Sequence, residues 1–69
     1  PAYVRDVAAA IDAAAAQNGR TVDAGTLART LIALVDGLGL QHCIEPGSMA
    51  AESASSACRA LLEPHVGPF

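Results

Sequence analysis

The stretch DAGTLARTLIALVDGLGLQHCIEPG, residues 23–47, decides the fold of this chain. Asp23 is a favourable N-cap, because its carboxylate can accept hydrogen bonds from the free amides of a first helical turn. Pro46 and Gly47 end the pattern, since proline cannot continue a helix and glycine readily takes the left-handed conformation. The stretch therefore predicts one long helix, from about residue 24 to residue 44.

Apolar side chains occupy more than one side of this predicted helix. One row consists of Leu27, Leu31, Leu34 and Leu38. A neighbouring row consists of Ala28, Ile32, Val35, Gly39 and Cys43. A third row contains small or polar residues flanked by Leu40 and Ile44, namely Thr26, Thr30, Ala33, Gly37 and Gln41. A helix that is apolar around most of its girth needs cover on two sides, and we expect a second copy of the chain to supply one of them.

Two glycines and one carboxylate interrupt the middle of the helix. Gly37 and Gly39 each cost roughly 1 kcal/mol relative to alanine, which close approach of another backbone would offset. A kink at Asp36-Gly37 is the competing explanation. The Asp36 carboxylate would be costly to bury without a partner. It is either solvated at an edge, paired with Arg29 or Arg59, or in contact with a polar group across an interface.

Shorter helices are predicted on both sides. The first spans about residues 2–18, because Asn18-Gly19 is a typical stop and the preceding apolar positions follow one stripe. The third spans about residues 50–63, with Ser48 or Ala50 near its cap and Pro64 ending it, since the residue before a proline is pushed out of helical geometry. Residues 65–69 are expected to form a tail. The fold class is therefore all-α, a single domain over residues 1–69 with three antiparallel helices.

Length and composition indicate a small hydrophobic core. The chain has 69 residues, of which 52% are hydrophobic, but only one Phe, one Tyr and no Trp. Domains of this size bury only ~60% of their unfolded surface. An isolated monomer would therefore be marginally stable, and a partner surface would help to decide whether it folds.

Charge and cysteine content restrict the class of protein. The net charge is −3, with four arginines and no lysine, so no basic stripe for nucleic acid is present. Two cysteines do not make a disulfide framework, and we expect buried reduced thiols, with a bridge between helices as the alternative. We expect a cytoplasmic protein with no membrane contact, because no signal peptide or uninterrupted apolar stretch of spanning length is evident. The start at Pro1, without Met, suggests a fragment of a longer protein.

No catalytic, cofactor or metal site is predicted. His42 and Cys43 are adjacent, so on a helix they point about 100° apart and do not converge on a metal ion together with Glu45 and His65. Asp36 lacks a second titratable group to share catalytic work. The Gly37-Leu38-Gly39 sequence lies within the helix and so does not form a phosphate-binding loop. We therefore do not expect an enzyme, and a small cofactorless enzyme ranks last among the possible functions.

The order of these motifs resembles a known family. Residues 27–41, LARTLIALVDGLGLQ, are followed by Ile44-Glu45-Pro46-Gly47 and an Ala/Glu-rich helix that ends in Leu-Leu. This pattern is similar to the C-terminal end of TetR-family bacterial transcriptional repressors. In that family a long helix with Asp-Gly-Leu near its middle breaks at an acidic-Pro turn before a final helix. The similarity covers most of the chain from Asp23 onward.

The resemblance implies an effector-binding and dimerisation domain, whose last two helices pair with those of a second subunit in a four-helix bundle. It implies a dimer surface formed by Gly37, Leu40, Gln41, Ile44, Ala54, Cys58, Leu61 and Leu62. It also implies that Leu27, Leu31, Leu34 and Leu38 face the subunit's own core or part of a cavity for a small apolar effector. DNA would be bound only by an N-terminal helix-turn-helix that this chain lacks.

The leading expectation is therefore the homodimerisation and ligand-sensing region of a TetR-like repressor. The alternative is a stand-alone helical adaptor that binds a partner helix in a groove.

Overall fold

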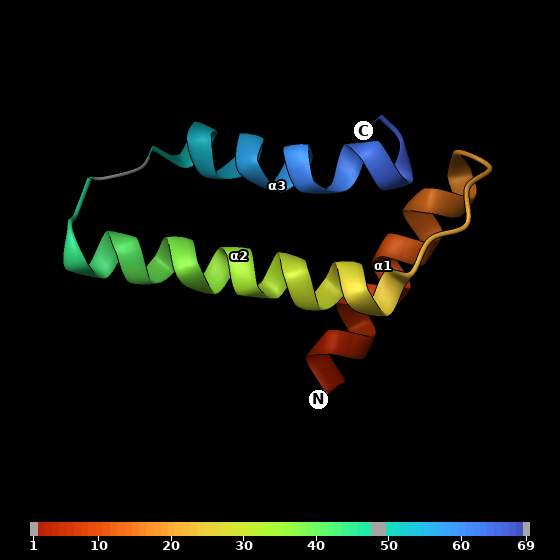
Figure 1. Cartoon of the computed structure of the whole chain (residues 1–69), viewed down its shortest axis with the longest axis horizontal. Helices are drawn as coiled ribbons and strands as arrows, with labels where there is room; N and C mark the ends of the chain where they lie inside the picture. Colours follow the sequence, from red (N-terminus) through yellow and green to blue (C-terminus); the bar gives the residue numbers. More distant parts are fainter. Residues whose placement is uncertain (1, 48–49, 69) are drawn as a thin grey trace.

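The computed structural model describes residues 2–47 and 50–68, which form three helices and no strand (Figure 1). Helix α1 spans Ala2–Gln17, α2 spans Ala24–Ile44 and α3 spans Ala51–Val66. The all-α prediction is confirmed. Helix α2 continues through Asp36 and Gly37, so these residues do not break it.

The connection between α1 and α2 follows the expected stop and cap signals. Gly19 has a φ of +67°, and the Arg20 amide donates to the carbonyl of Ala15 at 2.9 Å, which closes the end of α1. Asp23 then caps α2, because its Oδ1 accepts from the Thr26 amide at 3.1 Å and its Oδ2 accepts from the Thr26 hydroxyl at 2.8 Å. The first bond satisfies a backbone amide that has no partner within the helix, and the second holds the Asp23 carboxylate in place.

The other end of α2 stops at the predicted turn. The Glu45 amide donates to the carbonyl of Gln41 at 2.8 Å, and Gly47 takes a φ of +84°. Ala50 is the N-cap of α3 and provides no side-chain hydrogen bond. Ser48, the other predicted cap, lies outside the described residues.

Helix α3 runs past Pro64, so the prediction that this residue ends the helix and begins a tail was wrong. The missing amide of Pro64 removes one helical bond, but contacts with the connection between α1 and α2 hold the last turn. Asn18 Nδ2 donates to the Val66 carbonyl at 2.9 Å, and an Arg20 guanidinium nitrogen donates to the Pro64 carbonyl at 3.4 Å. Val66 itself is only 1% exposed. Tertiary packing therefore overrides the local preference.

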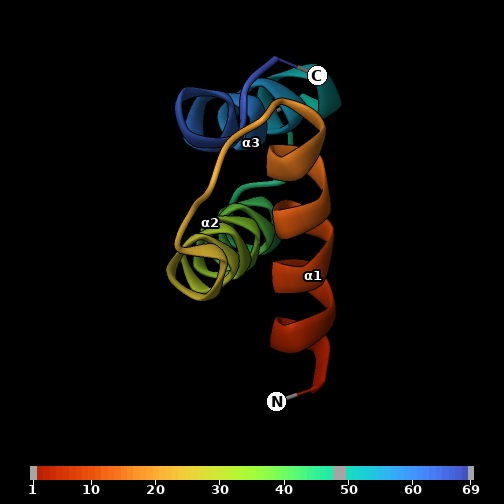
Figure 2. The same ribbon diagram turned by 90° about the vertical axis from the view of Figure 1, so that its right-hand side faces the viewer.

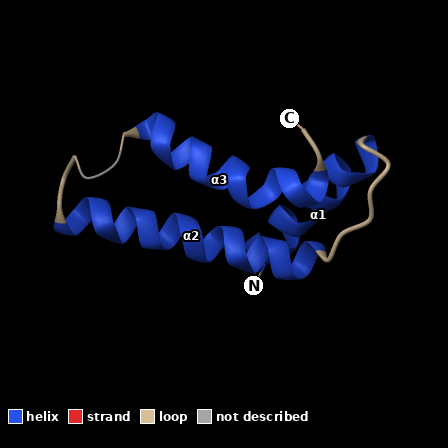
Figure 3. Ribbon diagram, turned by 45° about the horizontal axis from the view of Figure 1, so that its top comes forward, coloured by secondary structure: helices blue, strands red, loops and turns tan. Residues whose placement is uncertain are grey.

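The three helices do not form an antiparallel bundle. The chain runs along α2 to one end of the molecule and returns along α3, while α1 crosses both near the other end (Figures 1 and 3). Viewed along α2 and α3, α1 stands on one side of the layer that these two helices form (Figure 2). In the described part of the chain, no helix covers the opposite side of the layer.

The core lies where the three helices meet. Its buried residues are Ile11, Ala15, Ala24, Leu27, Ala28 and Val66. Beyond Ala28, none of the described residues of α2 is buried. We call residues 35–44 of α2 and 51–58 of α3 the arm, because they extend beyond this core.

The molecule is more extended and more exposed than a typical domain of its mass. Its radius of gyration is 12.9 Å, whereas about 11 Å is expected for this length. Its accessible surface is 4606 Å², whereas about 4000 Å² is expected for 6.9 kDa. The larger radius of gyration and the larger accessible surface agree with an arm that has no core of its own.

Candidate functional site

The outer face of the arm carries the largest exposed apolar side chains of α2. Leu40 is 61% exposed and Ile44 is 76% exposed. They lie one turn apart on the same face of the helix. Gln41 is exposed beside them and Gly37 is half-buried. A methyl group added at Gly37 would meet no atom within 4 Å, so this position is open.

The predicted contributors from α3 have different surroundings within the subunit. Ala54 and Cys58 line a groove of about 370 Å³ between α2 and α3, together with Leu38 of α2. Leu62 packs against the core. Leu61 is half-buried. Ala54 and Cys58 therefore lie at the arm groove and Leu62 lies against the core, while Cys58 and Leu62 also line a shared hollow of about 280 Å³.

The four leucines predicted to line a ligand cavity are also divided. Leu27 is only 8% exposed and belongs to the core. Leu31 lines a hollow where the three helices meet, and Leu38 lines the arm groove. Leu34 is half-buried. The crossing of α1 over only one half of α2 separates these environments.

The hollow at Leu31 has a volume of about 230 Å³ and receives side chains from all three helices. We call it the three-helix hollow. Its described lining residues are Val7, Ala10, Ile11, Ala14, Leu31, Leu62 and Val66. The residues of α1 were not predicted to line a cavity, although their apolar stripe, which includes Val7, Ile11 and Ala14, was evident in the sequence.

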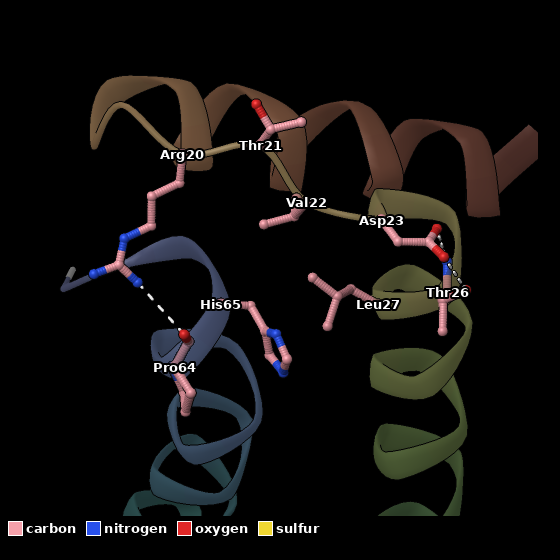
Figure 4. Close-up of a pocket in the computed structure, with 8 residues that line it drawn as sticks. All are labelled: Arg20, Thr21, Val22, Asp23, Thr26, Leu27, Pro64 and His65. Atoms are coloured by element: carbon pink, nitrogen blue, oxygen red, sulfur yellow. Dashed lines mark hydrogen bonds between the residues drawn. The ribbon is translucent and has the colours of Figure 1, made fainter.

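A more polar hollow of about 580 Å³ lies beside the connection between α1 and α2 (Figure 4). Leu27 and His65 extend toward it from α2 and α3, and Arg20 bridges to the Pro64 carbonyl. Asp23 turns toward Thr26. The hydrogen bonds from the side chain and then the backbone of Thr26 lower the pKa of the Asp23 carboxyl. This carboxylate therefore serves as a helix cap.

The groups considered for metal binding or catalysis remain apart. Within the described part of the chain, no group of three or more His, Cys, Asp or Glu side chains is placed to hold a metal ion. Both cysteines are free, with Cys58 half-buried and Cys43 exposed. The expectation that Cys43 is a buried thiol was wrong, because no side chain among the described residues covers it enough to bury it. Asp36 is exposed, which agrees with a solvated carboxylate.

Helix α2 is long and apolar enough to span a membrane when only its length and composition are considered. Its 21 residues include an 18-residue window with a mean hydropathy of 1.2, of which 11% is buried. The expectation concerned an uninterrupted apolar stretch, and the charged residues Arg29 and Asp36 interrupt α2. Helices that are covered by protein satisfy the same criterion, so this is weak evidence for a membrane span.

Comparison with known proteins identifies the family. A family model described as the C-terminal region of BetI-type transcriptional repressors matches residues 2–67. No curated protein and no solved structure matches the chain. The matching family consists of transcriptional regulators rather than enzymes. Because the match includes all three helices, this chain belongs to the TetR family of transcriptional regulators, as a C-terminal domain of the BetI type.

Proposed function

We propose that this chain is the dimerisation and ligand-sensing region of a TetR-like bacterial repressor that acts in the cytoplasm. The DNA-binding helix-turn-helix would belong to another part of the full protein. The observation that carries the proposal is the arm, where Leu40 and Ile44 are 61% and 76% exposed. The family match supports the proposal, because its description is that of a repressor's C-terminal region.

A second copy is a suitable cover for the uncovered side of α2 and α3. In an isologous dimer the same surface of both subunits is buried. Each exposed side chain of that surface is therefore buried once in each subunit and contributes twice to the association free energy. Full burial of a leucine or isoleucine contributes about 1.5–3 kcal/mol. Leu40 and Ile44 from two subunits would therefore supply a substantial part of the association free energy. The four-helix bundle formed by α2 and α3 of both subunits is the arrangement that we propose.

The charged residues of α2 favour contact of this helix with protein rather than with lipid. Arg29 and Asp36 are both exposed and both lie within the apolar helix. A charged side chain near the centre of a membrane-spanning helix costs about 2.5–3.5 kcal/mol. At the edge of a protein interface these two groups stay in water and incur no such cost.

Gly37 offers a sharp test, because a larger side chain fits the subunit but not a close interface. A Cβ at Gly37 or at Gly39 meets nothing within 4 Å, so the first carbon of a new side chain causes no clash at either position in the subunit. The two positions point about 200° apart around the helix. We expect Gly37→Leu to weaken dimerisation at least about tenfold through overpacking, while Gly39→Leu leaves it nearly unchanged.

Sedimentation velocity over a range of micromolar concentrations measures the effect, with circular dichroism to show that each variant is folded. A parent chain that is a stable monomer at these concentrations would contradict the dimer. Equal association of Gly37→Leu and the parent would contradict the placement of the interface.

Ligand sensing would act through the same helices. A small apolar effector that binds one arrangement of the helices more tightly than another shifts the population toward that arrangement. In the whole repressor, such a shift would alter the spacing of the two DNA-reading domains.

A further inference from the structure

We propose that α2 carries a self-complementary seam, through which two copies of the chain recognise each other in one antiparallel register centred on Gly37. The seam consists of Thr30, Ala33, Gly37, Leu40 and Ile44. The inference rests on the proposed function and deepens it, because it names the contacts between the copies and explains how an identical chain is selected as the partner. Thr30 and Ala33 are not among the dimer residues that the family resemblance implies.

The five seam residues lie on one face of α2. They are separated by three, four, three and four positions, which is the heptad spacing of helices that pair along a seam. At 100° per residue they fall within an arc of about 80° around the helix. Gly37 is half-buried and the other four are exposed. The face is therefore continuous and open to a partner.

Side-chain size changes from one end of the seam to the other. Thr30 and Ala33 form a small end, whereas Leu40 and Ile44 form a large end and are 61% and 76% exposed. Gly37 separates the two ends. When a two-fold axis at Gly37 relates two antiparallel helices, a residue before Gly37 meets the partner residue that follows it by about the same number of positions. The large end of each copy then packs on the small end of the other.

Each large side chain has a hole to enter in this register. In paired helices a side chain inserts between residues i, i+3, i+4 and i+7 of the facing helix. The partner's Leu40 would enter the hole formed by Thr30, Ala33, Leu34 and Gly37, and the partner's Ile44 the hole formed by Thr26, Arg29, Thr30 and Ala33. A parallel pair would instead set leucine against leucine at position 40 and alanine against alanine at position 33, so that one site is overfilled and the other is underfilled.

The hydroxyl groups of the small end do not oppose burial. The Thr30 hydroxyl donates to the Thr26 carbonyl at 2.8 Å, and the Thr26 hydroxyl donates to the Asp23 carboxylate at 2.8 Å. Both donors are thus satisfied within the subunit. A side chain from a second copy can cover the two threonines without leaving either donor unpaired.

Charges beside the seam favour the same register. Arg29 and Glu45 are both exposed, and each lies eight positions from Gly37. The antiparallel register brings Arg29 of each copy to the level of the partner's Glu45, whereas a parallel pair brings like charges to the same level. Opposite charges that flank a seam between two helices help to set their orientation.

The size pattern also restricts which chains can pair. A helix that is large at both ends would clash with Leu40 and Ile44, and a helix that is small at both ends would leave their holes empty. Specificity of this kind depends on the penalty for the wrong partner as much as on contacts with the right one. The seam therefore favours an identical chain over a related regulator with another distribution of side-chain size.

An exchange of size between the two ends tests the register. Leu40→Ala and Ala33→Leu should each weaken dimerisation at least about tenfold, the first by emptying a hole and the second by overpacking. The double variant should associate within about threefold of the parent, because each new leucine meets a new alanine. Sedimentation velocity measures association, and circular dichroism shows that each variant is folded.

Val35→Ala is the matched control for Leu40→Ala. Val35 is 50% exposed but lines the arm groove, so its loss should leave dimerisation nearly unchanged. Equal effects of Val35→Ala and Leu40→Ala would overturn the proposal. A double variant that is no stronger than Leu40→Ala or Ala33→Leu alone would also overturn it.

A mixture of the two single variants tests partner selection. Ala33→Leu and Leu40→Ala chains that carry different tags should form mainly mixed dimers, because each large residue then meets a small one. A mixed fraction of no more than about half, the share expected from random pairing, would overturn the selection.

Cross-linking tests the register without any change of size in the middle of the seam. Thr30→Cys and Ile44→Cys chains, both in a Cys43→Ser, Cys58→Ser background, should form a disulfide with each other on mild oxidation. In a parallel pair these positions are 14 residues apart, or about 21 Å, whereas a disulfide requires Cα atoms within about 7 Å. Thr30→Cys chains that cross-link only among themselves would overturn the antiparallel register.

Failure of this inference is distinguishable from failure of the proposed function. Sedimentation of the parent alone tests the dimer, and a monomer there contradicts the proposed function. A dimeric parent whose variants do not follow the exchange of size overturns only the seam.

Discussion

Gly67 provides the most direct test of how the end of α3 is held. Its φ of 99° and ψ of 178° lie in a region of backbone conformation that is essentially restricted to glycine. A Cβ added to Gly67 would lie 2.9 Å from both Cγ and Nδ2 of Asn18. Asn18 cannot move away freely, because its Nδ2 donates to the Val66 carbonyl at 2.9 Å and to the Ala14 carbonyl at 3.3 Å.

The expected cost of Gly67→Ala has two parts. The backbone conformation imposes a strain of about 1–3 kcal/mol on a residue with a side chain. Displacing the Asn18 side chain forfeits a hydrogen bond worth about 0.5–1.5 kcal/mol. The free energy of unfolding should therefore fall by about 2–4 kcal/mol. For a domain of this size, such a loss lowers the Tm by roughly 10–30 °C.

Urea denaturation followed by circular dichroism measures this cost, at one protein concentration for all variants because dimerisation contributes to apparent stability. Gly39→Ala is the matched control. Its position is helical and open, so the same substitution should raise stability by up to about 1 kcal/mol. In an Asn18→Ala background, the penalty of Gly67→Ala should shrink to its backbone part. A Gly67→Ala variant within about 0.5 kcal/mol of the parent would refute the reasoning.

Three further outcomes are expected. Because the folded state lowers the pKa of Asp23, the stability that this carboxylate contributes is present above its ordinary pKa and is lost as the pH falls through the lowered value. Acid titration of unfolding should show this loss, and Asp23→Ala should remove it. Pro64→Ala should raise the free energy of unfolding by up to about 3 kcal/mol, because Pro64 lies inside α3; an unchanged urea midpoint would contradict this. In a timed assay with a thiol reagent, exposed Cys43 should react faster than half-buried Cys58, and equal rates would contradict their placement.

Local signals were sufficient to predict the helices and most of their ends. The N-cap at Asp23 and the helix stop at Gly19 depend only on residues a few positions away, so both can be predicted from the sequence. The extension of α3 past Pro64 was not predictable in this way. It depends on hydrogen bonds from Asn18 and Arg20, which are 48 and 44 residues away from their acceptors.

The candidate site was only partly predictable for a related reason. Helical periodicity indicated that α2 has two apolar sides, and the exposure of Leu40 and Ile44 agrees with an outer side that lacks cover within the subunit. Periodicity did not indicate where α1 crosses α2. That crossing decides that Leu31 faces the three-helix hollow and Leu38 the arm groove, although both belong to one row.

The uneven distribution of buried residues along α2 has a consequence for the turnover of the protein in the cell. The buried residues of this helix are Ala24, Leu27 and Ala28, all in its first two turns, so little tertiary burial opposes opening of the later turns in a lone subunit. Proteases cleave transiently opened segments in proportion to their population. If a second subunit covers the arm, unpaired subunits are degraded faster than paired ones. The abundance of such a regulator would then be sensitive to dilution, and cell growth that outpaces synthesis would deplete it more steeply than dilution alone.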